Sequence, residues 1–200
     1  MIKTIIFDLG NVIVNVDRTN LFKELTINSN KNTAYIKDYY ENSSVGRLFE
    51  RGKLKPKEFY ARVANELSLK MPFAHFKEIY CDIFTLNKDV ANLIQKLKKK
   101  NFRLILLSNT DVLHYEYIKN KYKIIDIFDD YVLSYKTGCR KPNPMIFLEA
   151  LKKAKTLPFN CLYFDDIPEF VYAARLMGIR AFQFKNYAKL VEDLKKSDII

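Results

Sequence analysis

Each of three apolar runs in this 200-residue chain ends in polar residues that could do chemistry. A fourth segment adds a cation between the second and third runs. A carboxylate can attack phosphorus, other carboxylates can bind Mg²⁺, and cationic or hydrogen-bonding groups can hold phosphoryl oxygens. The residues concerned are Asp8, Ser108 with Asn109, Lys141, and Asp165 with Asp166.

The residue types together predict phosphoryl transfer through a covalent aspartyl-phosphate. Asp165 and Asp166, with Asp8, offer the hard oxygen ligands that Mg²⁺ prefers, and the metal would neutralise repulsion between nucleophile and phosphate. The predicted phosphate-binding groups are Lys141, Ser108 and Asn109. Each residue alone has a structural explanation, such as a helix N-cap for Ser108 or a surface position for Lys141. The functional interpretation depends on their coming together.

Strands and helices alternate from residue 86 onward, which predicts an α/β fold with a doubly wound, mostly parallel, Rossmann-like sheet. The first strand precedes Asp8, and Gly10 behind it would let backbone approach a bound group closely. The carboxyl ends of parallel strands lie along one edge of a sheet, where such folds bind ligands. The polar segments are therefore expected to converge at that edge. We expect an α/β core domain over residues 1–16 and 86–200.

Residues 17–85 have amphipathic helical patterns and no convincing core strand, which predicts an inserted α-helical cap domain. Pro56 is expected in the first turn of one helix, and a further helix is expected after Pro72, continuing through Ile83. A cap next to the site could exclude water and select the substrate. Its candidate selectors are Tyr39, Tyr40, Arg47 and Phe49.

The formal charge of +11 is unusual and would favour encounter with phosphorylated metabolites. Lysines occur in most helical segments, and no nucleic-acid-binding motif is present, so the sequence argues against a nucleic-acid partner. Three separated cysteines and the absence of a long apolar segment or signal pattern predict a cytoplasmic protein without a membrane partner. A monomer or weak dimer is expected.

Over essentially its whole length, the sequence resembles the haloacid dehalogenase-like (HAD) hydrolase superfamily. The inserted helices resemble the small cap of its first subfamily. The motifs look most like those of sugar-phosphate phosphatases of the glucose-1-phosphate type and of the amino-terminal phosphatase domain of epoxide hydrolases. The resemblance is carried by Phe7-Asp8-Leu9-Gly10-Asn11-Val12, Leu107-Ser108-Asn109-Thr110, Arg140-Lys141-Pro142 and Phe164-Asp165-Asp166.

This resemblance implies a Mg²⁺-dependent phosphatase acting on a small phosphorylated metabolite, plausibly a sugar phosphate. Asp8 would be the nucleophile, and the Gly10 carbonyl would bind Mg²⁺ together with Asp8, Asp165 and Asp166. Lys141 would act in catalysis, and it would also hold the phosphate with Ser108 and Asn109.

The chain departs from the family pattern at two positions. Gly10 stands where most phosphatases of the family carry an acid/base Asp, and such a loss typically costs about 10² to 10⁴ in rate. Asp17 is the nearest carboxylate downstream that could substitute, unless the leaving group needs little protonation. Phe170 stands where relatives often have Asn.

Three alternatives remain open from the sequence. A catalytically weak or silent binding module would explain Gly10 and Phe170. A 2-haloacid dehalogenase would tolerate Gly10, but it would not need the acidic pair Asp165-Asp166. A nucleic-acid-associated protein is suggested by the charge alone.

Overall fold

The computed structural model describes residues 1–200, and at its centre is a five-stranded parallel sheet in the order β5-β4-β1-β6-β7. Consecutive strands along the chain lie first on one side of β1 and then on the other, so the topology switches direction at β1. This arrangement confirms the predicted doubly wound α/β fold, with strand ends close to those expected. The strands are β1 (Thr4–Phe7), β4 (Arg103–Ser108), β5 (Asp130–Leu133), β6 (Cys161–Asp165) and β7 (Arg180–Gln183).

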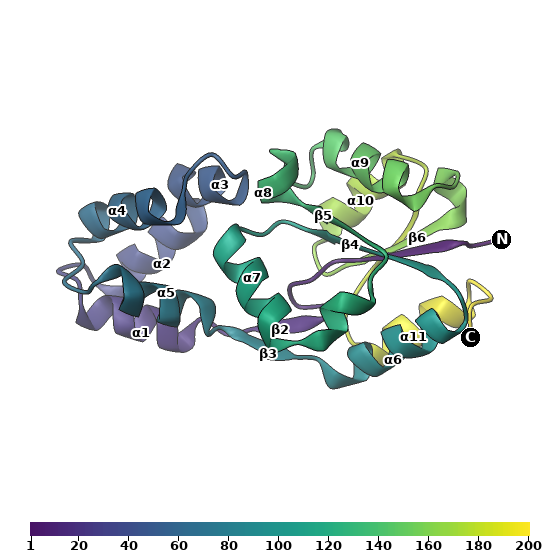
Figure 1. The fold of residues 1–200 in the computed structure, drawn as a ribbon, viewed down its shortest axis with the longest axis horizontal. Coiled ribbons are helices and arrows are strands. Elements are labelled where there is room, and N and C mark those ends of the chain that lie inside the picture. Colours follow the sequence, from purple (N-terminus) through teal and green to yellow (C-terminus); the bar gives the residue numbers. More distant parts are fainter.

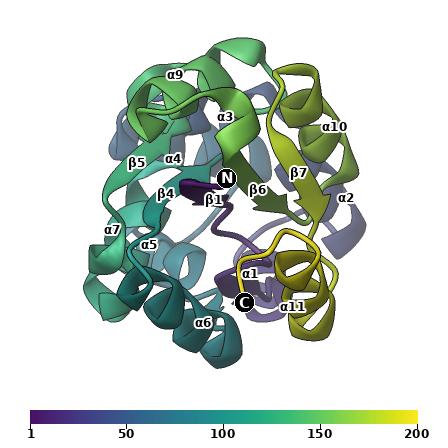
Figure 2. The ribbon, with the colours of Figure 1, turned by 90° about the vertical axis from the view of Figure 1, so that its right-hand side faces the viewer.

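Helices cover both faces of the sheet (Figures 1 and 2). Side chains of α9 and α10 pack on one face around Ile6 and Tyr163. Side chains of α6, α7 and α11 pack on the other face around Phe7 and Phe164. The helices of this part are α6 (Lys88–Lys99), α7 (Val112–Lys121), α8 (Ser134–Thr137), α9 (Pro144–Ala154), α10 (Pro168–Leu176) and α11 (Tyr187–Lys195), with 3₁₀ turns η1 (Lys123–Ile127) and η2 (Pro158–Asn160).

The helical insertion lies at one end of the molecule, beyond the carboxyl ends of the strands (Figure 1). Pro56 occupies the first turn of α4, as expected. The apolar stripes of the helices face one another and bury Leu25, Ile36 and Phe76 almost completely. The helices are α1 (Thr19–Ile27), α2 (Thr33–Asn42), α3 (Ser44–Glu50), α4 (Pro56–Leu67) and α5 (Phe73–Cys81).

A two-stranded antiparallel ribbon, β2 (Val14–Val16) with β3 (Phe84–Leu86), connects the insertion to the sheet. As expected, residues 17–85 add no strand to the core sheet, but their last two residues belong to the ribbon strand β3. The helix expected after Pro72 is present as α5, but it ends at Cys81, so its expected continuation to Ile83 is wrong. A three-residue strand has no recognisable period of its own, and β3 depends on pairing with a segment about 70 residues away in the chain.

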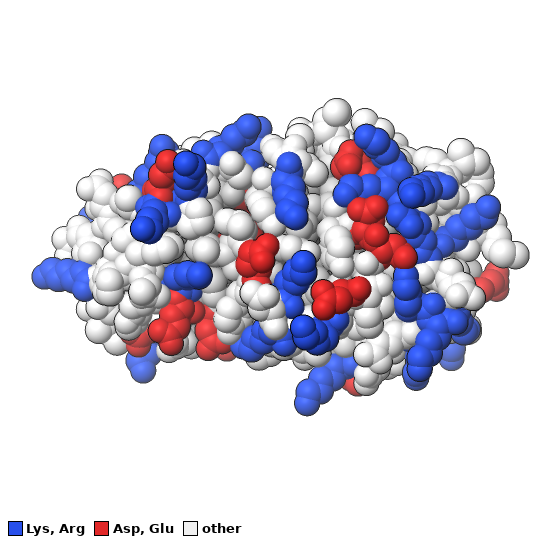
Figure 3. Space-filling model, in the orientation of Figure 1, with Lys and Arg blue, Asp and Glu red and all other residues white.

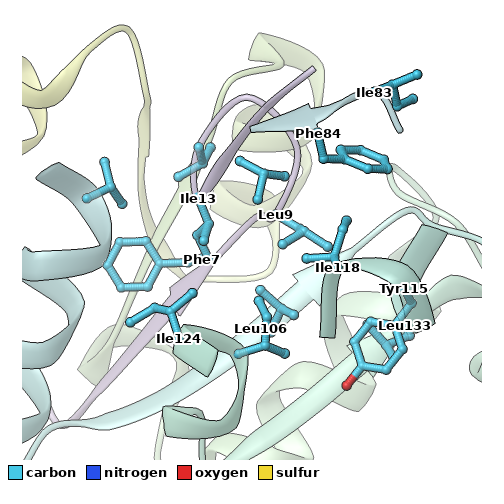
Figure 4. Packing of buried hydrophobic residues seen from close by; sticks show 14 of the residues in the cluster. Phe7, Leu9, Ile13, Ile83, Phe84, Leu106, Tyr115, Ile118, Ile124 and Leu133 are labelled. Atoms are coloured by element: carbon cyan, nitrogen blue, oxygen red, sulfur yellow. The ribbon is translucent and has the colours of Figure 1, made fainter. Parts of the chain in front are cut away.

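One hydrophobic cluster of 41 buried residues runs from the sheet into the insertion. In Figure 4, Leu9, which follows β1, lies between Ile13 and Phe84, the first residue of β3. The ribbon is thus packed against the same core that holds the sheet. Movement of the insertion would disturb this continuous packing.

The surface view in Figure 3 shows lysine and arginine side chains over both parts of the molecule, with acidic side chains between them. This distribution agrees with the spread of lysines along the sequence. No helix has the combination of length and apolar character that crossing a membrane requires.

Candidate active site

Lys141 lies between two carboxylates at the carboxyl edge of the sheet. Its Nζ is 2.7 Å from Asp8 Oδ1 and 2.6 Å from Asp165 Oδ2. Asp8 directly follows β1, and Asp165 is the last residue of the adjacent strand β6. The Lys141 side chain is 1% exposed, so these charges compensate one another away from water. Three segments that are distant in sequence therefore meet as the strand pattern predicts.

Tyr163 completes this buried group, and the sequence reasoning missed it. Its hydroxyl donates a hydrogen bond to Asp165 Oδ2 and lies 3.2 Å from Lys141 Nζ. Tyr163 stands two residues before Asp165 in β6, so both side chains point to the same face of the sheet. That two-residue spacing was the available signal.

Asn109 holds the backbone that carries Lys141. Its Nδ2 donates to the Lys141 carbonyl at 3.0 Å, and its Oδ1 accepts from the Lys141 backbone N–H at 2.7 Å. The side chain thereby fixes the position of the lysine, which sequence reasoning did not anticipate. Its predicted contact with phosphate stays a prediction.

Ser108, the last residue of β4, is buried, and its hydroxyl makes no hydrogen bond to another protein group. It is not the N-cap of the next helix, because Asp111 caps α7 by accepting from the backbone N–H groups of Leu113 and His114. The structural explanation considered for Ser108 therefore does not hold. Its hydroxyl remains available to a ligand in the adjacent cavity.

Asp166 lies half-buried beside the buried group and is held by Asn11. The Asn11 Nδ2 donates to Asp166 Oδ2 at 3.1 Å, while Asn11 Oδ1 accepts from the Val16 backbone N–H at 3.2 Å. Asn11 itself has φ +52°, a left-handed conformation that asparagine tolerates better than most residues. This turn also places Gly10 at the wall of the cavity.

The three carboxylates fit a divalent cation. Asp8, Asp165 and Asp166 each offer an oxygen, and these oxygens lie within 4.8 Å of one another. Opposite ligands of an octahedral Mg²⁺ are about 4.2 Å apart, given metal–oxygen distances of about 2.1 Å, so the oxygens would close by a fraction of an ångström to bind the ion. Three ionised carboxylates against the one ammonium of Lys141 leave two uncompensated negative charges, which a divalent ion would balance.

The pKa shifts of Asp8, Asp166 and Lys141 agree with an excess of negative charge in this group. Burial raises the pKa of Asp8 from 3.8 to about 7, against the opposing effect of Lys141. Burial also raises the pKa of Asp166. Burial alone would lower the pKa of Lys141, but the carboxylates of Asp8 and Asp165 outweigh it and raise that pKa. A cation bound here would favour the ionised form of the acids.

Phe170, the unusual residue of the fourth motif, contacts the same lysine. Its ring centroid lies 5.1 Å from Lys141 Nζ, within the range of a cation–π interaction. The aromatic ring therefore adds a favourable contact to the ammonium group. Phe170 therefore still contacts Lys141 at the position where relatives often have asparagine.

A cavity of about 180 Å³ lies between the strand ends and the insertion. Gly10, Ser108 and Asn109 line it from the sheet side, and α2 and α3 line it from the insertion side. Three of the four candidate selectors belong to its wall, namely Tyr39, Tyr40 and Arg47.

Phe49 and Asp17 do not have the positions expected of them. Phe49 is 1% exposed and stacks on Phe59 inside the insertion, so it cannot select a substrate directly. Asp17 lies outside the cavity wall, and its carboxylate accepts from the Thr19 backbone N–H. Hydrogen bonds from the Thr19 side chain and from its backbone N–H lower the pKa of Asp17, which makes it a poor proton donor. Both are corrections to the sequence-based expectations.

Comparison with known proteins places this geometry in a family. A family model for haloacid dehalogenase-like hydrolases matches residues 2–178. A D-ribitol-5-phosphate phosphatase of Bacteroides thetaiotaomicron is 27% identical over 201 residues, covering 97% of each chain.

Solved structures share the fold over nearly the whole chain. A HAD family enzyme of Bacteroides thetaiotaomicron, in complex with magnesium and inorganic phosphate, superposes with a TM-score of 0.83 at 23% identity, covering 95% of this chain and 99% of the other. A predicted HAD-like hydrolase of Porphyromonas gingivalis gives a TM-score of 0.83 at 22% identity, covering 97% and 98%. With its motifs at the strand ends and the match over residues 2–178, the chain belongs to the haloacid dehalogenase-like hydrolases.

Proposed function

We propose that this protein is a Mg²⁺-dependent phosphatase that hydrolyses a small phosphate monoester through an aspartyl-phosphate. The observation that carries the proposal is the buried group of Asp8, Lys141 and Asp165 beside Asp166, next to a cavity that the neighbouring residues Gly10, Ser108 and Arg140 line. The phosphatase name of the 27% identical relative and the magnesium and phosphate bound to the similar structure support it.

In this mechanism Asp8 attacks the phosphorus atom. Lys141 donates to Oδ1 of that carboxylate, whose second lone pair remains available to a metal, and Oδ2 is the oxygen assigned to the attack. The Lys141 ammonium and the Ser108 hydroxyl stabilise the negative charge that develops on the phosphoryl oxygens. Water then hydrolyses the aspartyl-phosphate and regenerates the Asp8 carboxylate.

Mg²⁺, when bound, would neutralise the phosphate charge and bring it to the carboxylate. Asp8, Asp166 and the Gly10 carbonyl are the proposed ligands. Asp165 has less free capacity, because its Oδ2 already accepts from Lys141 and Tyr163 and its Oδ1 from the Ile167 backbone N–H. We therefore assign Asp165 mainly to holding Lys141, with Asp166 as the stronger metal ligand.

The proposed substrate is a sugar or polyol phosphate, and residues 17–85 are proposed to act as the cap domain that selects it. The named substrate of the 27% identical relative supports a polyol phosphate. The placement of the insertion over the cavity supports the cap. Assignment to the first HAD subfamily, with resemblance to glucose-1-phosphate-type and epoxide-hydrolase phosphatases, belongs to the same proposal.

The test is a panel of phosphate esters assayed with Mg²⁺ and with EDTA. The panel contains D-ribitol 5-phosphate, glucose 1-phosphate and 4-nitrophenyl phosphate. We expect EDTA to lower turnover by at least about 100-fold, because metal stabilisation of transition-state charge is worth several kcal/mol. Equal phosphate release in both conditions would contradict the metal-dependent mechanism. Ligand-induced thermal stabilisation without any phosphate release would instead identify a silent binding module.

A further inference from the structure

Gly10 leaves the proposed reaction without the carboxyl that protonates the leaving group. General acid–base catalysis typically contributes about 10² to 10⁴ in rate, so an alkyl ester would need another proton donor. The wall of the cavity that includes Gly10 also includes two glutamates of the insertion, Glu41 and Glu50. They are the carboxylates to consider once Asp17 is set aside.

Glu50 is the better placed of the two. Its Oε2 lies 2.5 Å from Arg140 Nε, whereas the exposed Glu41 forms no ion pair. Arg140 directly precedes Lys141, the residue that binds Asp8. The ion pair thus holds the Glu50 carboxyl against the segment that carries the catalytic lysine.

Arg140 pairs with Oε2 of Glu50, which leaves Oε1 as the carboxyl oxygen for a ligand. The Glu50 side chain is 32% exposed in the cavity and can meet a ligand. Arg140 therefore holds the Glu50 carboxyl in place, while a ligand in the cavity can still reach it.

The two residues after Glu50, the last residue of α3, fix the insertion to the core domain. Arg51 Nε donates to the Gly138 carbonyl at 2.9 Å, beside the Arg140 segment. Gly52 has φ +67°, and a Cβ there would lie 2.1 Å from the Tyr135 carbonyl oxygen. Only glycine permits this close approach of the turn after α3 to α8. The position of Glu50 is consequently set by contacts on both sides of it.

The surroundings of Glu50 favour a carboxyl that can hold a proton. Burial raises the pKa of Glu50 above 4.5, against the opposing effect of Arg140. The other charged and titratable groups that face it are Asp111 and His114 from α7, Tyr40 from α2 and Tyr80 from α5. Asp111 favours the protonated form of Glu50, and His114 opposes it.

We propose that Glu50 donates the proton to the leaving-group oxygen, in place of the carboxyl absent at Gly10; the inference rests on the proposed phosphatase function. As Asp8 forms its bond to phosphorus, the ester P–O bond breaks and the leaving oxygen takes the Glu50 proton, giving a neutral alcohol and a Glu50 carboxylate. In the second half, that carboxylate takes a proton from the attacking water as the bond between phosphorus and Asp8 breaks.

The experiment compares kcat/KM of Glu50→Gln on two ester types, because kcat/KM reports only the steps through leaving-group departure. One ester is the alkyl phosphate that the wild type hydrolyses best, and the other is 4-nitrophenyl phosphate, whose leaving group departs as an anion. We expect a loss of at least about 100-fold on the alkyl ester and less than about threefold on the aryl ester. The wild-type decline of alkyl kcat/KM at high pH should vanish in the variant.

Two further variants keep the result interpretable. Glu50→Asp should recover part of the alkyl activity, because it keeps an acid. Glu78→Gln, at an exposed position of α5 outside the cavity wall, should change both substrates less than about threefold. An equal loss on both esters would overturn the proposal and show that Glu50 has only a structural role, linking α3 to Arg140. No loss on either ester, or a wild type that hydrolyses only aryl esters, would also overturn it. A wild type that hydrolyses neither ester with Mg²⁺ would instead contradict the proposed function itself.

Discussion

Replacing Asp8 by Asn is expected to reduce phosphate release to background, a loss of about five orders of magnitude or more. Loss of a catalytic nucleophile has effects of this size, because no covalent intermediate can form. Asparagine keeps nearly the same shape and can still accept from Lys141, so the fold should be retained. The measurement is kcat with Mg²⁺ on the best substrate of the panel.

The same Asp8→Asn substitution should raise the thermal stability of the metal-free protein. Because the pKa of Asp8 is raised from 3.8 to about 7, its protonated form stabilises the metal-free fold at low pH, and that stabilisation is lost as pH rises through about 7. The Asn variant has no such proton to lose. In EDTA it should therefore unfold at a higher temperature than the wild type at pH 8, with a smaller difference at pH 4.

Asp17→Asn is the matched control for this substitution. Asp17 is an exposed carboxylate outside the cavity, hydrogen-bonded to the Thr19 backbone. Activity within about twofold of the wild type is expected. Loss of activity in both variants, or full activity in Asp8→Asn, would contradict the assignment of the nucleophile.

Replacing Lys141 by Met is expected to have the largest effect on stability. The substitution leaves the buried carboxylates of Asp8 and Asp165 without their cation, and breaking such a buried pair costs about 3–5 kcal/mol. For a chain of this size the melting temperature should fall by roughly 6–20 °C. The fall should be smaller at pH 5 than at pH 8, because a protonated Asp8 no longer needs a partner.

Magnesium should restore part of the stability that Lys141→Met loses, since a divalent ion can balance the carboxylates. Turnover should still fall by about 10² to 10³, because in the proposed mechanism the metal cannot replace the Lys141 ammonium as a donor to the phosphoryl oxygens. Lys152→Met, at an exposed position of α9, is the control and should unfold like the wild type. A Lys141→Met protein as stable as this control would show that the buried ion pairs do not form.

The sheet could be predicted from sequence because its strands are short apolar runs that end in polar residues. The strand Arg103 to Ser108 and the strand Cys161 to Asp165 have this form. Since parallel strands end along one edge, the convergence of Asp8, Ser108 and Asp165 followed from topology alone.

The rest depended on contacts between segments far apart in the chain. The ribbon strand β3 exists only through its pairing with β2, and Asn109 acquires its role only when it reaches the Lys141 backbone. The pairing of Glu50 with Arg140 joins a helix of the insertion to the third motif. Phe49 was assigned to the cavity because helical periodicity finds a buried face without saying which neighbour covers it.

The most direct test of the account is to trap the phosphoenzyme. Wild-type protein is mixed with Mg²⁺ and 4-nitrophenyl phosphate, quenched in acid within one turnover, digested with trypsin and analysed by mass spectrometry. We expect one phosphoryl group on the peptide of residues 4–18, located at Asp8 by fragmentation and absent from the Asp8→Asn protein. A phosphoryl group on another residue, or rapid turnover with no phosphoenzyme on any time scale, would contradict Asp8 as the nucleophile.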